Sequence, residues 1–313
     1  MSLQFPSDNE IKIILAPLID NISSISKLEK GTSRNALIIK SGGKKYILKL
    51  FDKNHVKSLN RQIKQLRMIN KERGVAINPL NGKVLNFNKS VGYLYEYFEG
   101  KLYRQARLSN KLRFLGRIAG VFDQQASKVI KSGKSNMFYR EVLGNYNDIK
   151  GYFSELPNKE AVTNSLSNGF ALLNNFKKSK FRTQLVHGDI HADNVLYNNG
   201  NYLIIDVDGI RENNLVIEPV TMIRCLLGER DAKNKIKEFL SGYESKVKLS
   251  NDEKKAVPYF LVLRMMNEVW WFVYQLKRGL ITRKQYNEWI KPCLNRLNSL
   301  ISNFDKWLNE FKH

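Results

Sequence analysis

The feature that most constrains the fold of this chain is a run of polar residues between two apolar segments in its second half. Residues 185–196 read LVHGDIHADNVL, and residues 203–209 read LIIDVDG. Apolar residues bracket each acidic cluster, so we expect the polar side chains to lie at strand ends and to face one cleft. These side chains are His187, Asp189, Asn194 and Asp206.

Three of these side chains carry oxygen atoms at a spacing that fits phosphoryl transfer. Asp189 can position an attacking hydroxyl and accept its proton, while the amide of Asn194 and the carboxylate of Asp206 can hold Mg²⁺ against nucleotide phosphates. The alternative is that Asp189 and Asn194 only build a turn, beside an ordinary Asn-Gly hairpin and a carboxylate that ends a strand. That alternative explains each residue separately but not their order, so the sequence favours a kinase.

The N-terminal part carries a second candidate for phosphate binding. Residues 22–51 alternate between apolar and polar positions around two glycine-containing turns, which predicts three antiparallel strands. Three residues of the first turn are candidates for covering the nucleotide phosphates, although glycine is also common in ordinary hairpin turns. These candidates are Gly31, Thr32 and Ser33. Lys49 stands between two leucines, so it lies on the opposite strand face from them, where its ammonium could reach phosphate oxygens.

The rest of the chain changes from strand signals to helix signals. Residues 55–73 have apolar positions at helical spacing, and residues 83–98 alternate again before a glycine-bearing turn. The remainder is mainly helical, apart from strand signals between residues 183 and 208. We therefore predict a domain over residues 1–99, with an antiparallel sheet and one helix for phosphate binding. A helical domain with the catalytic loop and the acceptor site should follow over residues 100–313.

The order of these motifs resembles the aminoglycoside phosphotransferase and choline kinase-like family. The shared series is a glycine turn, a strand lysine, a helix, a strand into a hinge, His-Gly-Asp-x-His-x-x-Asn and Ile-Asp, over residues 28–228. The resemblance implies an α+β, bilobal protein-kinase-like fold. Its N-lobe would be a small antiparallel sheet and its C-lobe mainly helical.

The resemblance also implies roles for individual residues. Asp189 would be the catalytic base, and Asn194 and Asp206 would bind Mg²⁺. Lys49 would contact the α and β phosphates of ATP, and the backbone from Glu96 to Phe98 would read adenine. The first turn would cover the phosphates.

Three more polar residues of the motif allow more than one interpretation. We interpret His187 as an orienting residue in the hydrogen-bond network of the loop rather than as a base. His191 completes a His-x-x-x-His pair, but without a third soft ligand we do not expect zinc there. Asp208 either aids a second metal or the substrate, or is a solvated turn carboxylate.

The sequence departs from the family at the first helix. The family has an acidic residue there that pairs with the strand lysine, and Gln62 occupies that place. Gln62 can accept a hydrogen bond from Lys49, but it supplies no charge to orient the ammonium. A slow kinase or an inactive relative therefore stays an alternative.

The charge of the chain bears on the acceptor. The sequence has 52 Lys and Arg against 29 Asp and Glu, a formal net charge of +23. Such a surface collects cations poorly, so we predict a small neutral or anionic hydroxyl acceptor: a sugar, an amino alcohol or a glycolipid head group. The alternatives are a protein kinase of the same fold and a catalytically weak pseudokinase that binds polyanions. An anionic partner, membrane or nucleic acid, would fit the charge, although compositional drift also explains part of it.

The remaining signals concern location and the most apolar segment. Two cysteines are too few for a disulfide framework, and the N-terminus lacks a signal-peptide pattern, so we expect a reducing cytoplasm. Charged residues interrupt the apolar segment 259–276, which predicts a buried helix rather than a membrane span. Its aromatic residues are candidate acceptor walls, although the sequence favours core packing for them. They are Trp270, Trp271, Phe272 and Tyr274.

Overall fold

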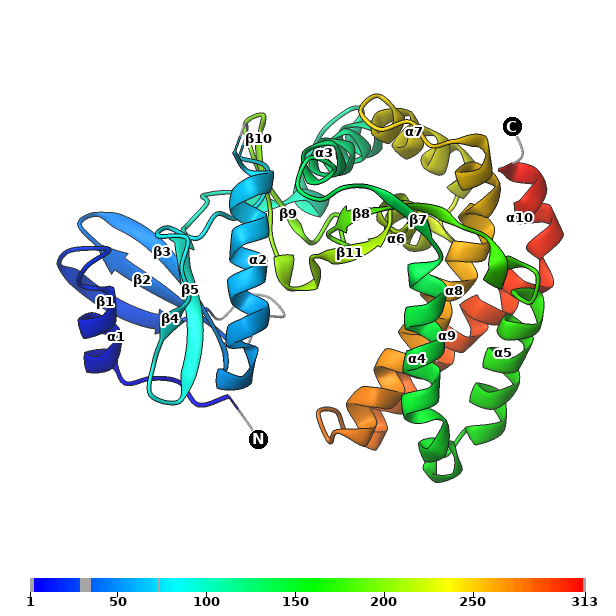
Figure 1. Ribbon diagram of the computed structural model, residues 1–313, viewed down its shortest axis with the longest axis horizontal. Coiled ribbons are helices and arrows are strands. Elements are labelled where there is room, and N and C mark those ends of the chain that lie inside the picture. The colour runs from blue at the N-terminus through cyan, green and yellow to red at the C-terminus, as the bar shows by residue number, and fades with distance from the viewer. Residues whose placement is uncertain (1–2, 29–34, 72–73, 312–313) are drawn as a thin grey trace. The chain divides into compact units, whose positions relative to one another are not determined.

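The computed structural model describes residues 3–28, 35–71 and 74–311. The chain forms two compact units (Figure 1). The first comprises Met1–Ser109 and Ala192–Ile210, and the second comprises Asn110–His191 and Arg211–His313. This division differs from a single boundary after residue 99, because the segment 192–210 pairs with strands of the first unit. The functions predicted for the two domains stay predictions.

The first unit is built on a five-stranded antiparallel sheet in the order β1-β2-β3-β5-β4. Its strands are β1 (Ile22–Lys27), β2 (Ala36–Ser41), β3 (Lys44–Asp52), β4 (Leu85–Asn86) and β5 (Ser90–Glu96). Its helices are α1 (Asp8–Leu15) and α2 (Val56–Ile69). The three strands and the following helix confirm the sequence prediction, whereas α1 was not predicted.

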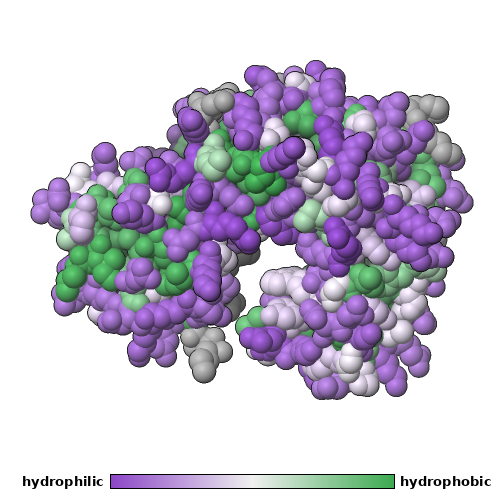
Figure 2. Space-filling model, in the orientation of Figure 1, coloured by the Kyte–Doolittle hydropathy of each residue, from purple (hydrophilic) through white to green (hydrophobic). Residues whose placement is uncertain are grey.

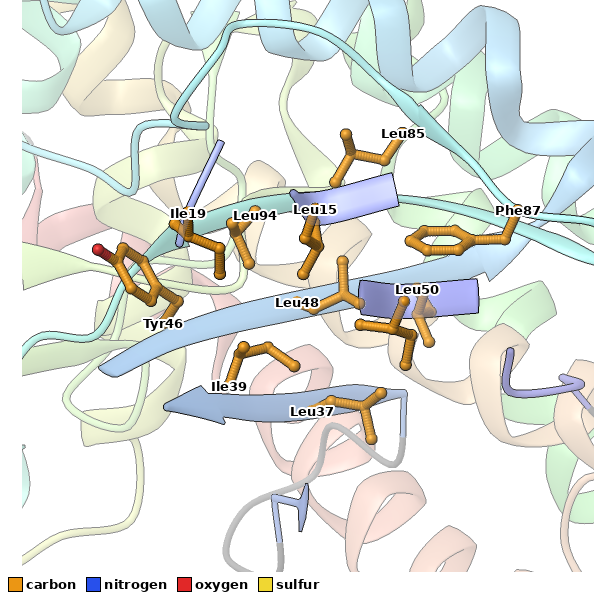
Figure 3. Close-up of a cluster of buried hydrophobic side chains, with 11 residues drawn as sticks. Leu15, Ile19, Leu37, Ile39, Tyr46, Leu48, Leu50, Leu85, Phe87 and Leu94 are labelled. Atoms are coloured by element: carbon orange, nitrogen blue, oxygen red, sulfur yellow. The ribbon is translucent and has the colours of Figure 1, made fainter. Parts of the chain in front are cut away.

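Alternation along β3 divides its side chains between the two faces of this sheet. Leu48 and Leu50 join Leu15 of α1 in a buried apolar cluster (Figure 3). Because successive side chains of a strand point to opposite faces, Lys49 lies on the other face, as predicted.

A three-stranded sheet in the order β10-β9-β6 completes the first unit. Its strands are β6 (Lys101–Leu102), β9 (Val195–Asn198) and β10 (Asn201–Ile204). The turn between β9 and β10 has φ angles of 45° at Asn199 and 86° at Gly200, which is typical of a type I′ hairpin. The N–H of Ile77 donates to the Ile204 carbonyl at 3.0 Å, so this hairpin is tied to a much earlier part of the chain.

The second unit is mainly helical, as predicted, around a three-stranded sheet in the order β11-β8-β7. The strands are β7 (Gly133–Ser135), β8 (Phe181–Val186) and β11 (Arg211–Asn214). The helices are α3 (Lys111–Ala126), α4 (Met137–Ile149), α5 (Lys159–Leu172), α6 (Ile217–Leu226), α7 (Ala232–Glu244), α8 (Asn251–Lys277), α9 (Arg283–Ser302) and α10 (Phe304–Glu310). Short 3-10 helices cover Lys53–His55, Tyr103–Gln105, Lys150–Glu155, Phe176–Lys178 and Val207–Gly209.

Helices α3 and α7 pack through direct backbone contact. A Cβ atom on Gly242 of α7 would lie 1.8 Å from the carbonyl oxygen of Arg113 in α3. A Cβ atom on Gly116 of α3 would lie 2.0 Å from the carbonyl oxygen of Phe239. Only glycine permits this close approach of the two helix backbones.

The surface agrees with the charged composition. Figure 2 shows a mainly hydrophilic face, with a hydrophobic area over strands of the first unit. Within the described part of the chain, no helix combines the length and the apolarity that crossing a membrane requires.

Candidate active site

In the first unit, Lys49 and two carboxylates form a charged cluster. The Nζ atom of Lys49 lies 2.9 Å from Oδ1 of Asp206 and 2.6 Å from Oδ2 of Asp208. The lysine side chain is 5% exposed, whereas the two carboxylates are 40% and 37% exposed. Burial alone would lower the pKa of Lys49, but the two carboxylates raise it above its ordinary value, so the lysine stays a cation. Asp208 therefore has a charged partner and is more than a solvated turn residue.

The turn that carries these carboxylates has an unusual backbone. Asp206 has φ 57° and ψ 48°, in the left-handed region that aspartate adopts more readily than most side chains. The short 3-10 helix Val207–Gly209 follows at once and returns Asp208 to the same lysine. Such backbone geometry is common at functional sites.

Gln62 holds this turn from α2. Its Nε2 atom donates a hydrogen bond to the carbonyl of Val207, and the residue is buried. The sequence allows Gln62 to accept a hydrogen bond from Lys49, and in the structure its amide donates one to the turn. The acidic partners of Lys49 come from the turn itself, so the missing acid on α2 does not leave the lysine uncompensated.

We expect Gln62→Glu to lower the free energy of unfolding by about 1–3 kcal/mol at neutral pH, because an ionised carboxylate cannot donate to the Val207 carbonyl. Urea denaturation at pH 7 and pH 4.5 would measure the loss. The loss should shrink at the lower pH, where a protonated carboxyl can donate. Gln124→Glu, on the exposed face of α3, is the matched control and should stay within about 0.5 kcal/mol of the parent. Equal losses for both variants would contradict the assigned hydrogen bond.

The backbone places the two predicted metal ligands, Asn194 and Asp206, at the open end of the β9–β10 hairpin. Val195 pairs with Ile204, and the N–H of Ile205 donates to the Asn194 carbonyl at 2.9 Å. Asn194 and Asp206 therefore flank the last paired residues of the hairpin. Amide and carboxylate oxygens suit Mg²⁺, which in kinases completes its shell with waters and substrate phosphates. Accordingly, no group of three or more His, Cys, Asp or Glu residues in the described ranges could hold a metal ion.

In the second unit, Asp189 has two cationic or polar neighbours. Its Oδ1 atom accepts a hydrogen bond from Nη2 of Arg264 at 2.8 Å, and its Oδ2 atom lies 3.5 Å from Nε2 of His191. Burial would raise the pKa of Asp189, but the His191 hydrogen bond and the Arg264 charge lower it to about 2. Asp189 is therefore ionised at neutral pH and can accept a hydrogen bond from a hydroxyl.

The histidines of the motif lie beside this carboxylate in different environments. The His187 ring is fully buried and lies edge-on to Phe122, with ring centroids 5.7 Å apart. That position fits an orienting residue better than a base that exchanges protons with solvent. His191 contacts Asp189 and is partly exposed.

Glu218, at the start of α6, was missed by the sequence analysis. Its Oε2 atom accepts hydrogen bonds from the N–H groups of His187 at 2.8 Å and Gly188 at 2.9 Å. Its Oε1 atom accepts one from the N–H of Ile190 at 3.2 Å. The carboxylate is fully buried and fixes the backbone on both sides of Asp189. The signal that could have found it is a single acid in the apolar run 215–223.

One face of α8 continues from Arg264. Glu268, one turn further, accepts two hydrogen bonds of 3.0 Å from Nη1 of Arg224. Trp271 follows at the next turn and is 46% exposed. The expected core packing is therefore wrong for Trp271, because the core face of α8 is formed by residues such as Val269 and Val273. Among the candidate wall residues, Trp271 and Tyr274 stack with ring centroids 6.1 Å apart.

Two predicted nucleotide contacts lie outside the clusters around Lys49 and Asp189. The turn with Gly31, Thr32 and Ser33 lies outside the described residues. Glu96 ends β5, and the N–H of Tyr97 donates to the Lys45 carbonyl at 3.0 Å. Recognition of adenine by the backbone from Glu96 to Phe98 stays a prediction.

Comparison with solved structures finds the same fold in several kinases. The amicoumacin kinase hAmiN has a TM-score of 0.69 at 17% identity, with 94% of each chain covered. A microcompartment-associated aminopropanol kinase has a TM-score of 0.69 at 14% identity, with 96% of this chain and 98% of that chain covered. The choline kinase LicA from Streptococcus pneumoniae has a TM-score of 0.64 at 17% identity, with 93% and 99% covered. These likenesses confirm the expected α+β bilobal kinase-like fold.

Comparison with protein families identifies the chain itself. No curated protein matches the sequence. A model of the phosphotransferase enzyme family matches residues 24–261, which is well over half of the chain and includes both the strand lysine and the His-Gly-Asp motif. The resemblance noted in the sequence is thus confirmed, and the chain belongs to the phosphotransferase enzyme family.

Proposed function

We propose that this phosphotransferase moves the γ-phosphoryl group of ATP, with Mg²⁺, to a hydroxyl group of a small acceptor that carries a negative charge. The observation that carries the ATP and Mg²⁺ part is the cluster of Lys49 with Asp206 and Asp208. The neighbours support it, because hAmiN was solved with AMP-PNP and Ca²⁺ and a spectinomycin phosphotransferase with ADP. These neighbours, with the aminopropanol kinase and the choline kinase, act on small molecules.

Each residue would contribute a distinct step. Lys49 would hold phosphate oxygens as a point charge, and its ion pairs keep its ammonium oriented before nucleotide arrives. Asn194 and Asp206 would hold Mg²⁺, which when bound neutralises charge on the transferred phosphoryl group. Asp189, ionised at neutral pH, would orient the acceptor hydroxyl and accept its proton. Glu218 positions the loop of Asp189 through three backbone N–H groups.

Nucleotide binding with and without Mg²⁺ tests this assignment. We expect ATP to stabilise the parent protein in a thermal-shift assay, with a clearly larger shift in Mg²⁺ than in EDTA. Asp206→Asn should reduce the Mg²⁺-dependent affinity about 10-fold or more, because the charged metal ligand is lost. Asparagine tolerates the left-handed backbone, so the variant should fold. Asp231→Asn, at another left-handed aspartate with φ 61°, is the matched control and should bind like the parent.

The negative charge on the acceptor rests on the surroundings of Asp189. Arg264 contacts Asp189 directly, and burial together with the charge of Arg224 lowers the pKa of Arg264. A guanidinium in this position would repel a choline-like cation and can donate to a carboxylate or phosphate.

A coupled ADP-release screen should therefore rank hydroxy acids, sugar acids and phosphorylated alcohols above neutral sugars, choline and aminoglycosides. Arg264→Gln should raise the KM of the best anionic acceptor about 10-fold or more while the KM of ATP stays unchanged, because a charge-assisted hydrogen bond is lost. Arg278→Gln, an exposed arginine just after α8, is the control. Fastest turnover of choline or of an aminoglycoside would overturn the anionic assignment but not the phosphotransferase.

Two alternatives make different predictions. A protein kinase of the same fold would label protein rather than metabolites with radioactive phosphate. A pseudokinase that binds polyanions would bind them with the same affinity in the presence and absence of ATP. The comparisons give the second alternative no support, since they match phosphotransferases along most of the chain.

A further inference from the structure

A cavity in the second unit shares no residue with the candidate active site. It lies between α7, the first half of α8 and α10, and its volume is about 540 Å³. This volume is typical of a site for a small molecule. Each residue that lines it is described by the structure, and none belongs to the catalytic loop, the Arg264 face or the Lys49 cluster.

The floor of the cavity is apolar and preformed. It is formed by Ile236, Leu240, Leu249, Val257, Trp307 and Phe311. Val257 is fully buried, and Ile236 is 4% exposed. The floor belongs to several helices, and α7 is fixed to α3 by close backbone contact, so the cavity does not depend on one mobile segment.

Positive charge surrounds the mouth of the cavity. Four lysines and two glutamates line it, which leaves a net charge of 4 − 2 = +2. Lys233 pairs with Glu310 at 2.7 Å and Lys254 pairs with Glu244 at 3.0 Å, each across two helices. These two ion pairs join α7 to α10 and to α8 at the mouth.

The other two lysines, Lys237 and Lys306, also line the cavity. The hydrogen bond from Lys233 lowers the pKa of Glu310, and the charges of Lys237 and Lys306 lower it further. In the described ranges neither Lys237 nor Lys306 takes part in an ion pair, so both can bind a further anion.

We propose that this cavity binds a fatty carboxylate, with its aliphatic chain on the apolar floor and its head group at Lys237 and Lys306. The net positive charge at the mouth of the cavity would repel an aliphatic cation. An uncharged aliphatic ligand would leave Lys237 and Lys306 without a counter-charge. An aliphatic chain matches a floor composed mainly of Ile, Leu and Val side chains. The site needs neither nucleotide nor acceptor, so it stands independently of the proposed function.

The test is dodecanoate binding to the full chain, below the micelle concentration and without nucleotide. Isothermal titration calorimetry should show one saturable site, with 1-dodecanol and dodecyltrimethylammonium at least about 10-fold weaker. Tryptophan fluorescence should change on binding, and Trp307→Phe should remove that change, because Trp307 is the indole that lines the cavity.

Variants locate the site. The double variant Lys237→Gln with Lys306→Gln should weaken dodecanoate binding about 10-fold or more. The double variant Lys255→Gln with Lys284→Gln removes the same charge from exposed positions outside the cavity and should bind like the parent. Leu240→Trp, which fills the cavity, should abolish binding while the melting temperature shows a folded protein. Equal affinity for dodecanol, binding only above the micelle concentration, or binding that survives both the first double variant and Leu240→Trp would overturn the proposal.

Discussion

Asp189→Asn is expected to lower kcat by about 10²- to 10⁴-fold, because the amide cannot accept the proton of the acceptor hydroxyl. Asparagine keeps the size of the side chain and an oxygen that can accept from Arg264, so the loop should stay in place. The KM of ATP should change little. A coupled ADP-release assay with the best acceptor measures both constants, and Asp305→Asn on the exposed face of α10 is the control. A kcat within a few fold of the parent would remove Asp189 from the chemistry.

The same carboxylate sets an expectation for pH dependence. The folded-state pKa of Asp189 is about 2, below its ordinary value of 3.8. The stabilisation from its ionised form is therefore complete above about pH 4 and is lost as the pH falls through 2. Any loss of kcat/KM between pH 5 and pH 7 in the parent must come from another group. In Arg264→Gln the pKa of Asp189 should rise, because one of the charges that lower it is gone.

Glu218→Ala is expected to cause the largest loss of stability, about 3–5 kcal/mol, because it leaves buried N–H groups without their acceptor. The affected groups belong to the loop that carries Asp189, so kcat should fall as well. Glu218→Gln should lose less, since its amide oxygen still accepts hydrogen bonds while its amino group faces another donor. Urea denaturation gives the stabilities, and amide hydrogen exchange at His187, Gly188 and Ile190 reports the local effect.

The control for Glu218 is Glu212→Ala on β11, an exposed carboxylate six residues earlier in the sequence. It should stay within about 0.5 kcal/mol of the parent. If Glu218→Ala were equally mild, the three hydrogen bonds would not hold the loop. If exchange at His187 and Gly188 were unchanged, the same conclusion would follow without reference to global stability.

The sequence predicted those parts of the fold that follow from local periodicity. The side of the sheet on which Lys49 lies follows from strict alternation along β3. The Asn199-Gly200 hairpin, which the sequence offered only within the alternative to a kinase, is present in the structure. The strands β6 and β7, of two and three residues, carry too few positions for a pattern, so they were not predicted.

Side-chain roles that depend on distant partners could not be predicted in the same way. Gln62 was compared with the acid that the family has at its place, but its donation to Val207 needs a residue 145 positions later in the chain. Glu218 accepts hydrogen bonds from backbone N–H groups 28 to 31 residues earlier in the chain. The amino-acid sequence does not reveal which backbone N–H groups will need a side-chain acceptor. The charged partners of Lys49 were present in the motif, but only the fold shows that they pair with it.

The parallel β-bridge between Ala76 and Ile204 has a consequence for the order in which the protein folds during synthesis. The paired residues are 204 − 76 = 128 positions apart, and most of the residues between them belong to the second unit. On a ribosome, strands β1 to β5 can pair early, but the hairpin with Asn194 and Asp206 emerges only after the first half of the second unit. The early sheet therefore carries Lys49 without its carboxylates until residue 208 has left the exit tunnel. Assembly of the Lys49 cluster is therefore a late event in synthesis, and a nascent chain that ends before residue 206 lacks both carboxylates that pair with Lys49.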